Sequence, residues 1–498
     1  MSDKVEKDLV FEIPTSSECS TIIVGKDASK TGHVIVGHNE DDLDVVVLPY
    51  VVPRMKHQPG EMLYFEEGRA MIPQVEETYA YYWSEMRAST WKVSFSDSFM
   101  NEWGVGIVSN SCNPSKDEVL DPPNEQIGYG IRRLIAERAK TAREGVELAI
   151  ELIEKYGYFS NRTYSICDKN EGWALQINKG KHYVAKRVPD DEVMYIPNWY
   201  TIHNIDFNDT EHKNYYFAKD LVSFAIAKGW YTPAKENDYS DFDFANAYQA
   251  EGGVKGYNIF RGTNAWRFLL QEEPKDNRIF SAKLNRKFGL EDVKALMRFH
   301  YEGTPDDYTD GKNYCRNPHA DYYWPICTSR TAEGCIFEFN EVPALSCIWR
   351  TTLNPCTTLY VPWYLGNTKV PDGYNWYTPL AGQVTHFNTP ASDNEFNPAW
   401  AFWTFQTLMY FAALDYKRVH DAVEGPIKEI EAAWVNEKPI VEKTYLDLLA
   451  VNPEMATEYL TEYTNSKSQY AWDWAKKMIK QIGEAKFMEN LKWEPEQK

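Results

Sequence analysis

The sequence predicts an α+β protein with antiparallel sheets and a helical end. Short β-prone runs, separated by glycine and polar turns, fill residues 19–110, as expected for hairpin-connected strands. Two helical segments and a second group of short strands follow, and from Pro398 onward the pattern is almost entirely helical. Strands and helices that occur in blocks favour α+β layering over alternating parallel β-α-β units.

The first strands are predicted as two hairpins. The runs STIIVG (20–25) and HVIVG (33–37) flank KDASKTG, whose glycine and polar residues suit a hairpin loop. The runs WKVSFSDSF (91–99) and NEWGVGIVSNS (101–111) are predicted to form the second pair.

Two consecutive helices are predicted next, over residues 128–140 and 141–157. Thr141 and Glu144 have the spacing of a capping box, and Gly157 supplies a stop signal. Strands then return at hairpin spacing over 163–168, 172–178, 181–188 and 192–198.

No internal repeat, low-complexity linker or composition break divides the chain. We therefore expect a leader over residues 1–18, a catalytic domain over 19–395, and a helical portion of that same domain over 396–498. The run over 396–414 is uncharged but rich in aromatic rings, and it contains Pro398 and Gln406. Such a run is more typical of a buried helix than of a membrane span.

Composition excludes several classes of function. The 498 residues carry a net charge of −20 and no basic cluster, which argues against a nucleic-acid partner. Eight cysteines are too few for a disulfide scaffold and show no CxxC or Cys/His ligand spacing. The first 18 residues contain no apolar core of a secretory signal. We expect a soluble cytoplasmic protein with no membrane partner, either monomeric or a homo-oligomer.

Cofactor motifs are also missing from the sequence. It contains no Walker loop, GxGxxG turn, GxSxG elbow or HExxH pair, so no cofactor and no metal are expected. His33 and His38 are five residues apart in a strand pattern and would face opposite sides. Cys327 in ICTSRT is a second nucleophile candidate, but as a strand-interior residue it fits core packing better.

Cys19 stands at the head of the first predicted strand. If residues 1–18 were removed, Cys19 would be the first residue of the chain, and a cysteine in that position carries its own base. The α-amino group titrates near neutral pH and belongs to the same residue as the thiol. It can take the thiol proton and later pass it to a leaving group. This design requires removal of residues 1–18. The alternative is a buried structural thiol, which is far commoner for a cysteine in general.

Several segments of the chain follow a recognisable order: CSTIIVGKDASKTGHVIVGHNEDD, NEWGVGIVSNS, RVPDDEVMYIPNWYTIHNIDF, FDFANAYQAEGGVKGYNIFR, HYEGTPDDYT, ICTSRTAEG and CTTLYVPWYLG. Together they resemble the dipeptidase A and secernin family of cysteine N-terminal nucleophile peptidases. The resemblance covers roughly residues 19–435. It implies a four-layer αββα sandwich, in which helices cover both outer faces of two stacked antiparallel sheets.

The resemblance also implies roles for single residues. Cys19 would be the nucleophile and, through its freed amine, the base. Asp41 would hold that amine, although a turn or cap residue in an acidic stretch is the alternative. Asn101 would donate to the oxyanion and Asn198 would be a second active-site asparagine. Both asparagines also suit turns.

Two residues match the pattern of this family less closely. Arg261 matches the cation near the nucleophile, but the local spacing makes Arg267 a rival, and a surface arginine is an equal alternative. His38 stands where the family usually has arginine. A close carboxylate such as Asp41 could keep His38 protonated. The substitution predicts a steeper pH dependence near about pH 6–7.

The function expected is a cofactor-free cysteine dipeptidase acting through a Cys19 thioester. Attack of Cys19 on the Glu18 carbonyl would first release residues 1–18. Glu40 and Asp42 are the candidate carboxylates for the substrate amine. Two alternatives stay open: an acylase of the choloylglycine or penicillin V type acting on small amides, and a non-catalytic secernin-like protein.

Overall fold

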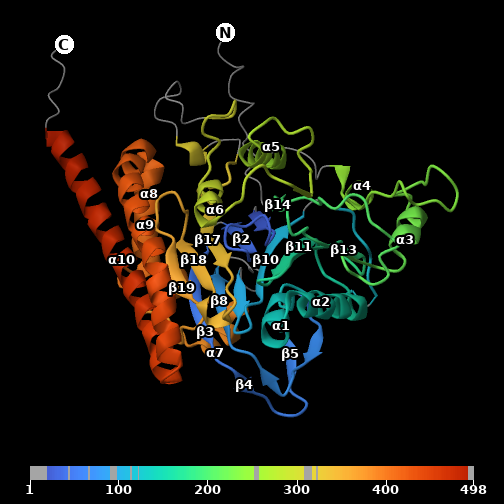
Figure 1. Ribbon diagram of the computed structural model, residues 1–498, viewed down its shortest axis with the longest axis horizontal. Helices are drawn as coiled ribbons and strands as arrows, with labels where there is room; N and C mark the ends of the chain where they lie inside the picture. The colour runs from blue at the N-terminus through green and yellow to red at the C-terminus, as the bar shows by residue number, and fades with distance from the viewer. Residues whose placement is uncertain are drawn as a thin grey trace, which may run out of the picture.

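The computed structural model describes residues 19–42, 45–65, 68–89, 98–112, 115–121, 123–251, 257–307, 317–320 and 324–491. Two antiparallel sheets occupy the centre of the molecule, and helices lie outside them (Figure 1). The expected leader and Glu18 fall outside the described residues, as do residues 90–97 of the second predicted hairpin.

The first sheet has seven strands and contains the predicted first hairpin. Its order is β16 (Ser281–Ala282), β14 (Val193–Ile196), β1 (Ser20–Val24), β2 (Ile35–Asp41), β17 (Thr331–Glu338), β18 (Cys347–Thr352) and β19 (Val361–Tyr364). Strands β1 and β2 pair antiparallel, with Thr21 opposite His38. Every residue of both strands is buried, because each lies in the interior of the sheet.

The second sheet has eight strands. Its order is β15 (Tyr215–Phe217), β13 (Tyr183–Arg187), β12 (Gly172–Ile177), β11 (Arg162–Cys167), β10 (Gly106–Ser111), β9 (Phe99–Asn101), β8 (Tyr81–Arg87) and β3 (Val46–Val52). Two small ribbons pair β4 (Met55–Lys56) with β7 (Glu77–Thr78), and β5 (Met62–Tyr64) with β6 (Met71–Pro73). Within the described part of the second predicted hairpin, β9 and β10 pair antiparallel.

One predicted pairing is wrong. Strands β11, β12 and β13 pair in succession as expected, but β14 does not continue this meander. It pairs with β1 in the other sheet, with Ile196 opposite Thr21. The hydrophobic pattern specifies that β14 is a buried strand, but it does not specify which strand edge it joins.

The predicted helical pair is confirmed as α1 (Ile131–Arg138) and α2 (Ala142–Tyr156). Thr141 caps α2 by accepting from the Glu144 amide at 3.1 Å, and Gly157 ends it with a φ of 75°. Both helices contact the eight-stranded sheet. The remaining short helices are α3 (Leu221–Ala227), α4 (Phe244–Tyr248), α5 (Tyr257–Leu270), α6 (Leu290–Met297), α7 (Pro379–Thr385), η2 (Pro318–Ala320), η3 (Pro343–Leu345), η4 (His386–Asn388) and η5 (Ala391–Asn394).

Helix α6 lies against the seven-stranded sheet at Gly37 of β2. A Cβ atom at Gly37 would lie 2.5 Å from Val293 Cγ1 of α6 and 2.9 Å from Ile22 Cγ2 of β1. Only a residue without a side chain allows this close approach. On the other side of the same sheet, β1 contacts β10 of the eight-stranded sheet. The residues next to Gly37 are therefore packed between a helix and the second sheet.

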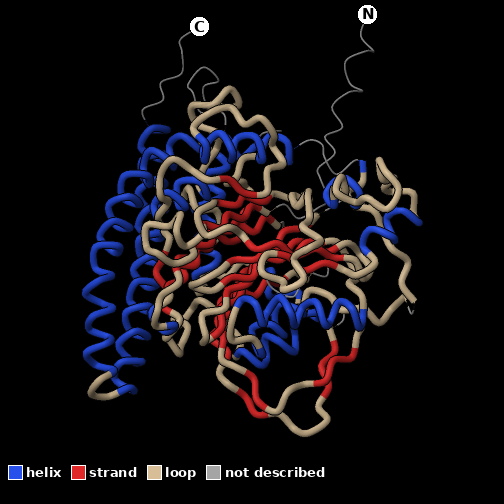
Figure 2. Tube along the Cα trace, turned by 45° about the vertical axis from the view of Figure 1, so that its right-hand side comes forward, coloured by secondary structure: helices blue, strands red, loops and turns tan. Residues whose placement is uncertain are grey.

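Three helices form the C-terminal portion: α8 (Ala401–Leu414), α9 (Tyr416–Leu449) and α10 (Pro453–Leu491). Figure 2 shows the long helices standing along one side of the sheets. Helix α10 contacts α8, α9 and β19. The aromatic run predicted as a buried helix forms α8, with Phe402, Phe405 and Leu408 buried. Across the described part of the chain, no helix is long and apolar enough to cross a membrane.

The close approach at Gly37 gives a test of this packing. Gly37→Ala should lower the free energy of unfolding by about 1–3 kcal/mol, because the added methyl overpacks the contact between α6 and β2. Gly483→Ala is the control, since its Cβ would meet Phe411 only at 4.0 Å. That change should raise stability by up to about 1 kcal/mol. Equal effects of the two changes in urea unfolding would contradict the packing argument.

Candidate active site

The site is centred on Cys19, the residue immediately before β1. Its side chain is fully buried. Its backbone nitrogen donates to Asn198 Oδ1 at 3.1 Å. Asn198 follows β14 and is oriented by its own amide nitrogen, which donates to the Ser111 carbonyl at 3.1 Å. The pairing of β14 with β1 therefore presents an oxygen acceptor to the Cys19 nitrogen.

His38 lies beside Cys19 in a hydrogen-bond chain that assigns the hydrogen on its Nδ1. Asn110 Nδ2 donates to the Ile196 carbonyl at 3.2 Å, so Asn110 Oδ1 faces Thr21 and accepts from its hydroxyl at 2.6 Å. The Thr21 hydroxyl donates its one hydrogen to Asn110, so it can only accept a hydrogen bond from His38 Nδ1, which lies at 2.7 Å. The other nitrogen, Nε2, lies 3.2 Å from the Glu40 carboxylate. If Glu40 is ionised and can only accept, both nitrogens donate and His38 is an imidazolium.

The carboxylate that accompanies His38 is Glu40, not Asp41 as the sequence suggested. The reason is strand alternation: residues 38 and 40 of β2 lie on one face and residue 41 on the other. The Cys19 sulfur, a His38 nitrogen and a Glu40 oxygen lie within 4.8 Å of one another. Cys19, His38 and Glu40 thus form one cluster, in which the His38 ring lies next to the sulfur.

Asp41 pairs with Arg261 instead. Arg261 Nη2 donates to Asp41 Oδ2 at 2.5 Å, and the Thr331 hydroxyl donates to Asp41 Oδ1 at 2.6 Å. Both charged side chains are fully buried. In the structure Asp41 holds this arginine, and the described partner of the Cys19 nitrogen is Asn198 rather than Asp41.

Arg261 reaches the nucleophile residue itself. Its Nη1 donates to the Cys19 carbonyl at 3.5 Å, and two further donors reach the carbonyls of Trp324 and Pro325 at 3.1 and 3.2 Å. Its rival Arg267 lies two turns further along α5 and pairs with Glu273 and Asp306. Of the two arginines, Arg261 is the one that belongs to the site.

Two predicted residues lie elsewhere. The Asn101 amide donates to the carbonyls of Ala136 and Ala139 at 3.0 and 2.6 Å, and its oxygen accepts from the backbone of the turn that follows. Its hydrogen-bonding capacity is therefore used, which supports the turn role rather than the oxyanion role. Asp42 lines a separate cavity of about 520 Å³ together with Arg330.

Sequence reasoning missed three residues. Thr21 and Asn110 complete the chain that orients His38. Arg162, at the start of β11, is buried, and its Nε has no hydrogen-bond partner among the described residues. Burial disfavours its charge, but the Cys19 sulfur is among the groups that keep the pKa of Arg162 well above its ordinary value. Thr21 could have been found, because it is two residues from Cys19 and so shares its face of the strand.

Burial dominates the ionisation of Asp41. Removal from water raises its pKa from 3.8 to about 6, although Arg261 and Thr331 pull it down. Above that pH Asp41 is the charged partner of Arg261, and below it the ion pair is lost.

A second group of reactive side chains lies away from Cys19. Cys327, expected to be a core residue, meets His300, His319 and Cys356, and the ligand atoms of all four lie within 4.8 Å of one another. These four side chains could together hold a metal ion, although the sequence shows no Cys/His ligand spacing. These residues are far apart in the sequence, so no short sequence motif indicates that they lie together.

A buried thiol that lies within 4.8 Å of an imidazole nitrogen and a carboxylate oxygen, with an arginine at the carbonyl of the same residue, has the groups needed for nucleophilic acyl transfer, which defines the class of cysteine hydrolases. Comparison with known proteins agrees, because residues 18–429 match peptidase family C69. The chain belongs to this family. The resemblance inferred from the sequence is thereby confirmed.

Several relatives are similar over most of their length. The probable dipeptidase B of Streptococcus pyogenes serotype M3 is 26% identical over 463 residues, covering 89% of this chain and 88% of the relative. The probable dipeptidase of Latilactobacillus sakei is 28% identical over 482 residues, covering 91% and 94%. Among solved structures, penicillin V acylase from Agrobacterium tumefaciens aligns over 67% of this chain and 82% of its own, with 11% identity and a TM-score of 0.29.

The pKa of Asp41 predicts how stability depends on pH. The folded state holds this proton more tightly than the unfolded state, so the resulting stabilisation is complete below pH 3.8 and lost as pH rises to about 6. A rise from 3.8 to about 6 corresponds to about 3 kcal/mol. Relative to Asp41→Asn, the wild type should therefore lose about 3 kcal/mol of unfolding free energy across this interval.

Urea unfolding of both proteins at several pH values measures this difference. Asp42→Asn serves as the neighbouring control and should follow the wild type in parallel. A difference between wild type and Asp41→Asn that does not change with pH would show that Asp41 has an ordinary pKa.

Proposed function

We propose that this protein is a cysteine dipeptidase whose nucleophile is a Cys19 freed at its amino terminus. The observation that carries the proposal is the bond from the Cys19 nitrogen to Asn198 Oδ1. Once residues 1–18 are removed, that nitrogen is an α-amine next to its own thiol. Asn198 then holds it in the place where it can act as base.

Activation would proceed by attack of Cys19 on the preceding peptide bond. The sulfur adds to the Glu18 carbonyl carbon, the carbon–nitrogen bond breaks, and a thioester forms while the Cys19 nitrogen takes up a proton. Water then hydrolyses the thioester, which releases residues 1–18 with a new carboxylate and restores the thiol. The Cys19 sulfur would then attack the substrate and the freed amine would act as its base, so the same groups perform self-cleavage and dipeptide hydrolysis.

The charges around Cys19 support this chemistry. The His38 imidazolium within the cluster stabilises a thiolate. It also replaces the positive charge that the family usually places there as arginine. Arg261, held by Asp41, donates to the Cys19 carbonyl and fixes the residue from its other side. We propose that these contacts keep the sulfur in position while the α-amine transfers the proton.

A dipeptide carries both of its charged ends close to the bond that is cut, since one residue spans about 4 Å. We propose that Glu40 receives the substrate ammonium, because Glu40 lies in the cluster with Cys19 whereas Asp42 lines another cavity. Arg162 is the matching cation for the substrate carboxylate. Its support is its burial, its unused Nε and its electrostatic interaction with the Cys19 sulfur.

We further propose a four-layer αββα arrangement and a cytoplasmic location. The layering is supported by the contacts of α6 with β2 and β17, of β1 with β10, and of α1 and α2 with the eight-stranded sheet. The location is supported by the free thiols of the seven cysteines that the structure describes.

Self-processing can be read from intact mass and N-terminal sequencing of the purified protein. The wild type should begin at Cys19, Cys19→Ala should keep residues 1–18, and Asn198→Ala should be processed more slowly. Cys167→Ala, a buried thiol on β11, should be processed like the wild type. A wild-type chain that keeps residues 1–18 and hydrolyses nothing would support the non-catalytic alternative.

Substrate choice can be tested with a dipeptide, its N-acetyl form and its C-terminal amide. The free dipeptide should be cleaved best, because Glu40 and Arg162 each gain a partner. Arg162→Gln should lower kcat/KM for the dipeptide by about 10-fold or more, the value of one charge-assisted hydrogen bond, and should leave the amide nearly unaffected. Arg267→Gln is the control and should change neither. Preference for the N-acetyl substrate would favour the acylase alternative.

A further inference from the structure

Four buried side chains from distant segments meet above the seven-stranded sheet. His300 follows α6, His319 lies in η2, Cys327 precedes β17 and Cys356 lies between β18 and β19. Each is at most 8% exposed. We call these four residues the Cys₂His₂ cluster. None of them takes part in the proposed reaction of Cys19.

The distances within the Cys₂His₂ cluster suit a tetrahedral ion. His300 Nε2 and His319 Nε2 are 2.9 Å apart, and His319 Nε2 lies 3.4 Å from Cys356 Sγ and 3.7 Å from Cys327 Sγ. Tetrahedral zinc places two nitrogens about 3.3 Å apart and a nitrogen and a sulfur about 3.6 Å apart. The observed separations lie on both sides of these values.

Ordinary hydrogen bonding accounts poorly for this arrangement. His319 Nε2 faces another imidazole nitrogen and two thiols at once, but it can share only one hydrogen. A cation at the centre would satisfy all four groups together. Two thiolates would also balance the charge of a divalent ion, which makes a buried site electrically neutral.

Surrounding groups hold the imidazoles for binding through Nε2. His300 Nδ1 lies 3.0 Å from Glu302 Oε1, and a carboxylate at this nitrogen directs the other one to a metal. Asn354 faces His319 Nδ1 at 3.4 Å through its amide nitrogen. Metal binding requires its oxygen there. A half-turn of the amide supplies the oxygen and turns the amide nitrogen toward the Thr357 hydroxyl, which in this structure donates to Asn354 Oδ1 at 2.5 Å.

We propose that the Cys₂His₂ cluster binds one zinc ion in a closed structural site. Two sulfur and two nitrogen ligands in tetrahedral geometry select zinc. Four protein ligands leave no position for water or substrate, so the ion would stabilise the fold rather than react.

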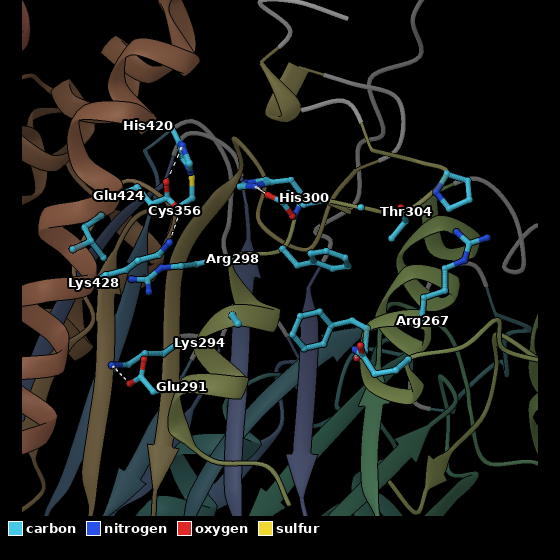
Figure 3. A pocket seen from close by; sticks show the side chains of 18 of the residues that line it. Arg267, Glu291, Lys294, Arg298, His300, Thr304, Cys356, His420, Glu424 and Lys428 are labelled. Carbon is cyan, nitrogen blue, oxygen red and sulfur yellow. Dashed lines mark hydrogen bonds and ion pairs between the residues drawn. The ribbon is translucent and has the colours of Figure 1, made fainter. Parts of the chain in front are cut away.

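A path for the ion is present. A cavity of about 750 Å³ borders the cluster and includes His300, Cys356, Glu302 and His420 among its lining residues. Figure 3 shows His300 and Cys356 at its wall. Metal exchange from solution therefore does not require the sheets to separate.

The cluster also bears on the active site. His319 and Cys327 bracket the segment whose carbonyls at Trp324 and Pro325 accept from Arg261. In addition, Asn39 of β2 donates to the Ile326 carbonyl at 2.8 Å. An ion that fixes both ends of this segment would fix the acceptors that hold Arg261 against Cys19.

Elemental analysis of the full-length chain, purified without a polyhistidine tag or chelator from zinc-supplemented cells, tests the proposal. The wild type should contain about one zinc per chain, as one closed site requires. Cys356→Ser and Cys327→Ser should lose most of it. Cys335→Ser and Cys347→Ser, buried cysteines of β17 and β18, should keep it.

Cobalt provides a readout that does not depend on activity or on the variants folding. Co²⁺ added to the metal-free wild type should produce the intense visible bands and the thiolate charge-transfer band of a tetrahedral site. Wild type with neither zinc nor cobalt bands would overturn the proposal. Zinc retained in both cysteine variants, or a mass showing a Cys327–Cys356 disulfide, would overturn it as well.

Discussion

The buried ion pair between Asp41 and Arg261 is the interaction on which the site depends. Removing two such charges from water costs several kcal/mol for each ion. The direct bond, the Thr331 hydroxyl and two backbone carbonyls that accept from the guanidinium offset part of this cost, and burial still raises the pKa of Asp41 to about 6. The pair joins β2, α5 and the segment before β17 at the Cys19 carbonyl. Removal of either side chain would leave the other buried without its partner, which would weaken the connection between these three elements.

Local features of the fold could be predicted from the sequence, because their causes are local. The hairpin of β1 and β2 and the helix capped by Thr141 depend on neighbouring residues, and both are present in the structure. The partner of β14 depends on which sheet edge is free, and no pattern within the strand records that. The same limit explains why Asn110 and Arg162 were missed, because Asn110 contacts Thr21 from the other sheet and Arg162 interacts electrostatically with the Cys19 sulfur from that sheet.

Two features of the chain could not be resolved from the sequence, the role of Asn101 and the Cys₂His₂ cluster. Asparagine serves turns and oxyanion sites equally well, so its presence in a matching segment could not distinguish the two roles for Asn101. The Cys₂His₂ cluster was missed because its ligands extend from residue 300 to residue 356 with no regular spacing. Metal motifs are recognisable in sequence when one turn or one helix supplies neighbouring ligands. Here the tertiary fold supplies the proximity.

Strand β14 pairs with β1 in one sheet although β13, which precedes it, belongs to the other, and this pairing affects when Cys19 can become reactive. Asn198 reaches the Cys19 nitrogen because β14 has joined β1, and its amide is aimed by Ser111 in the opposite sheet. Before the two sheets dock, the nucleophile lacks the group that orients its base. Removal of residues 1–18 would therefore occur only after the two sheets have docked. A newly made chain would carry its reactive thiol in a latent form until its own architecture is complete.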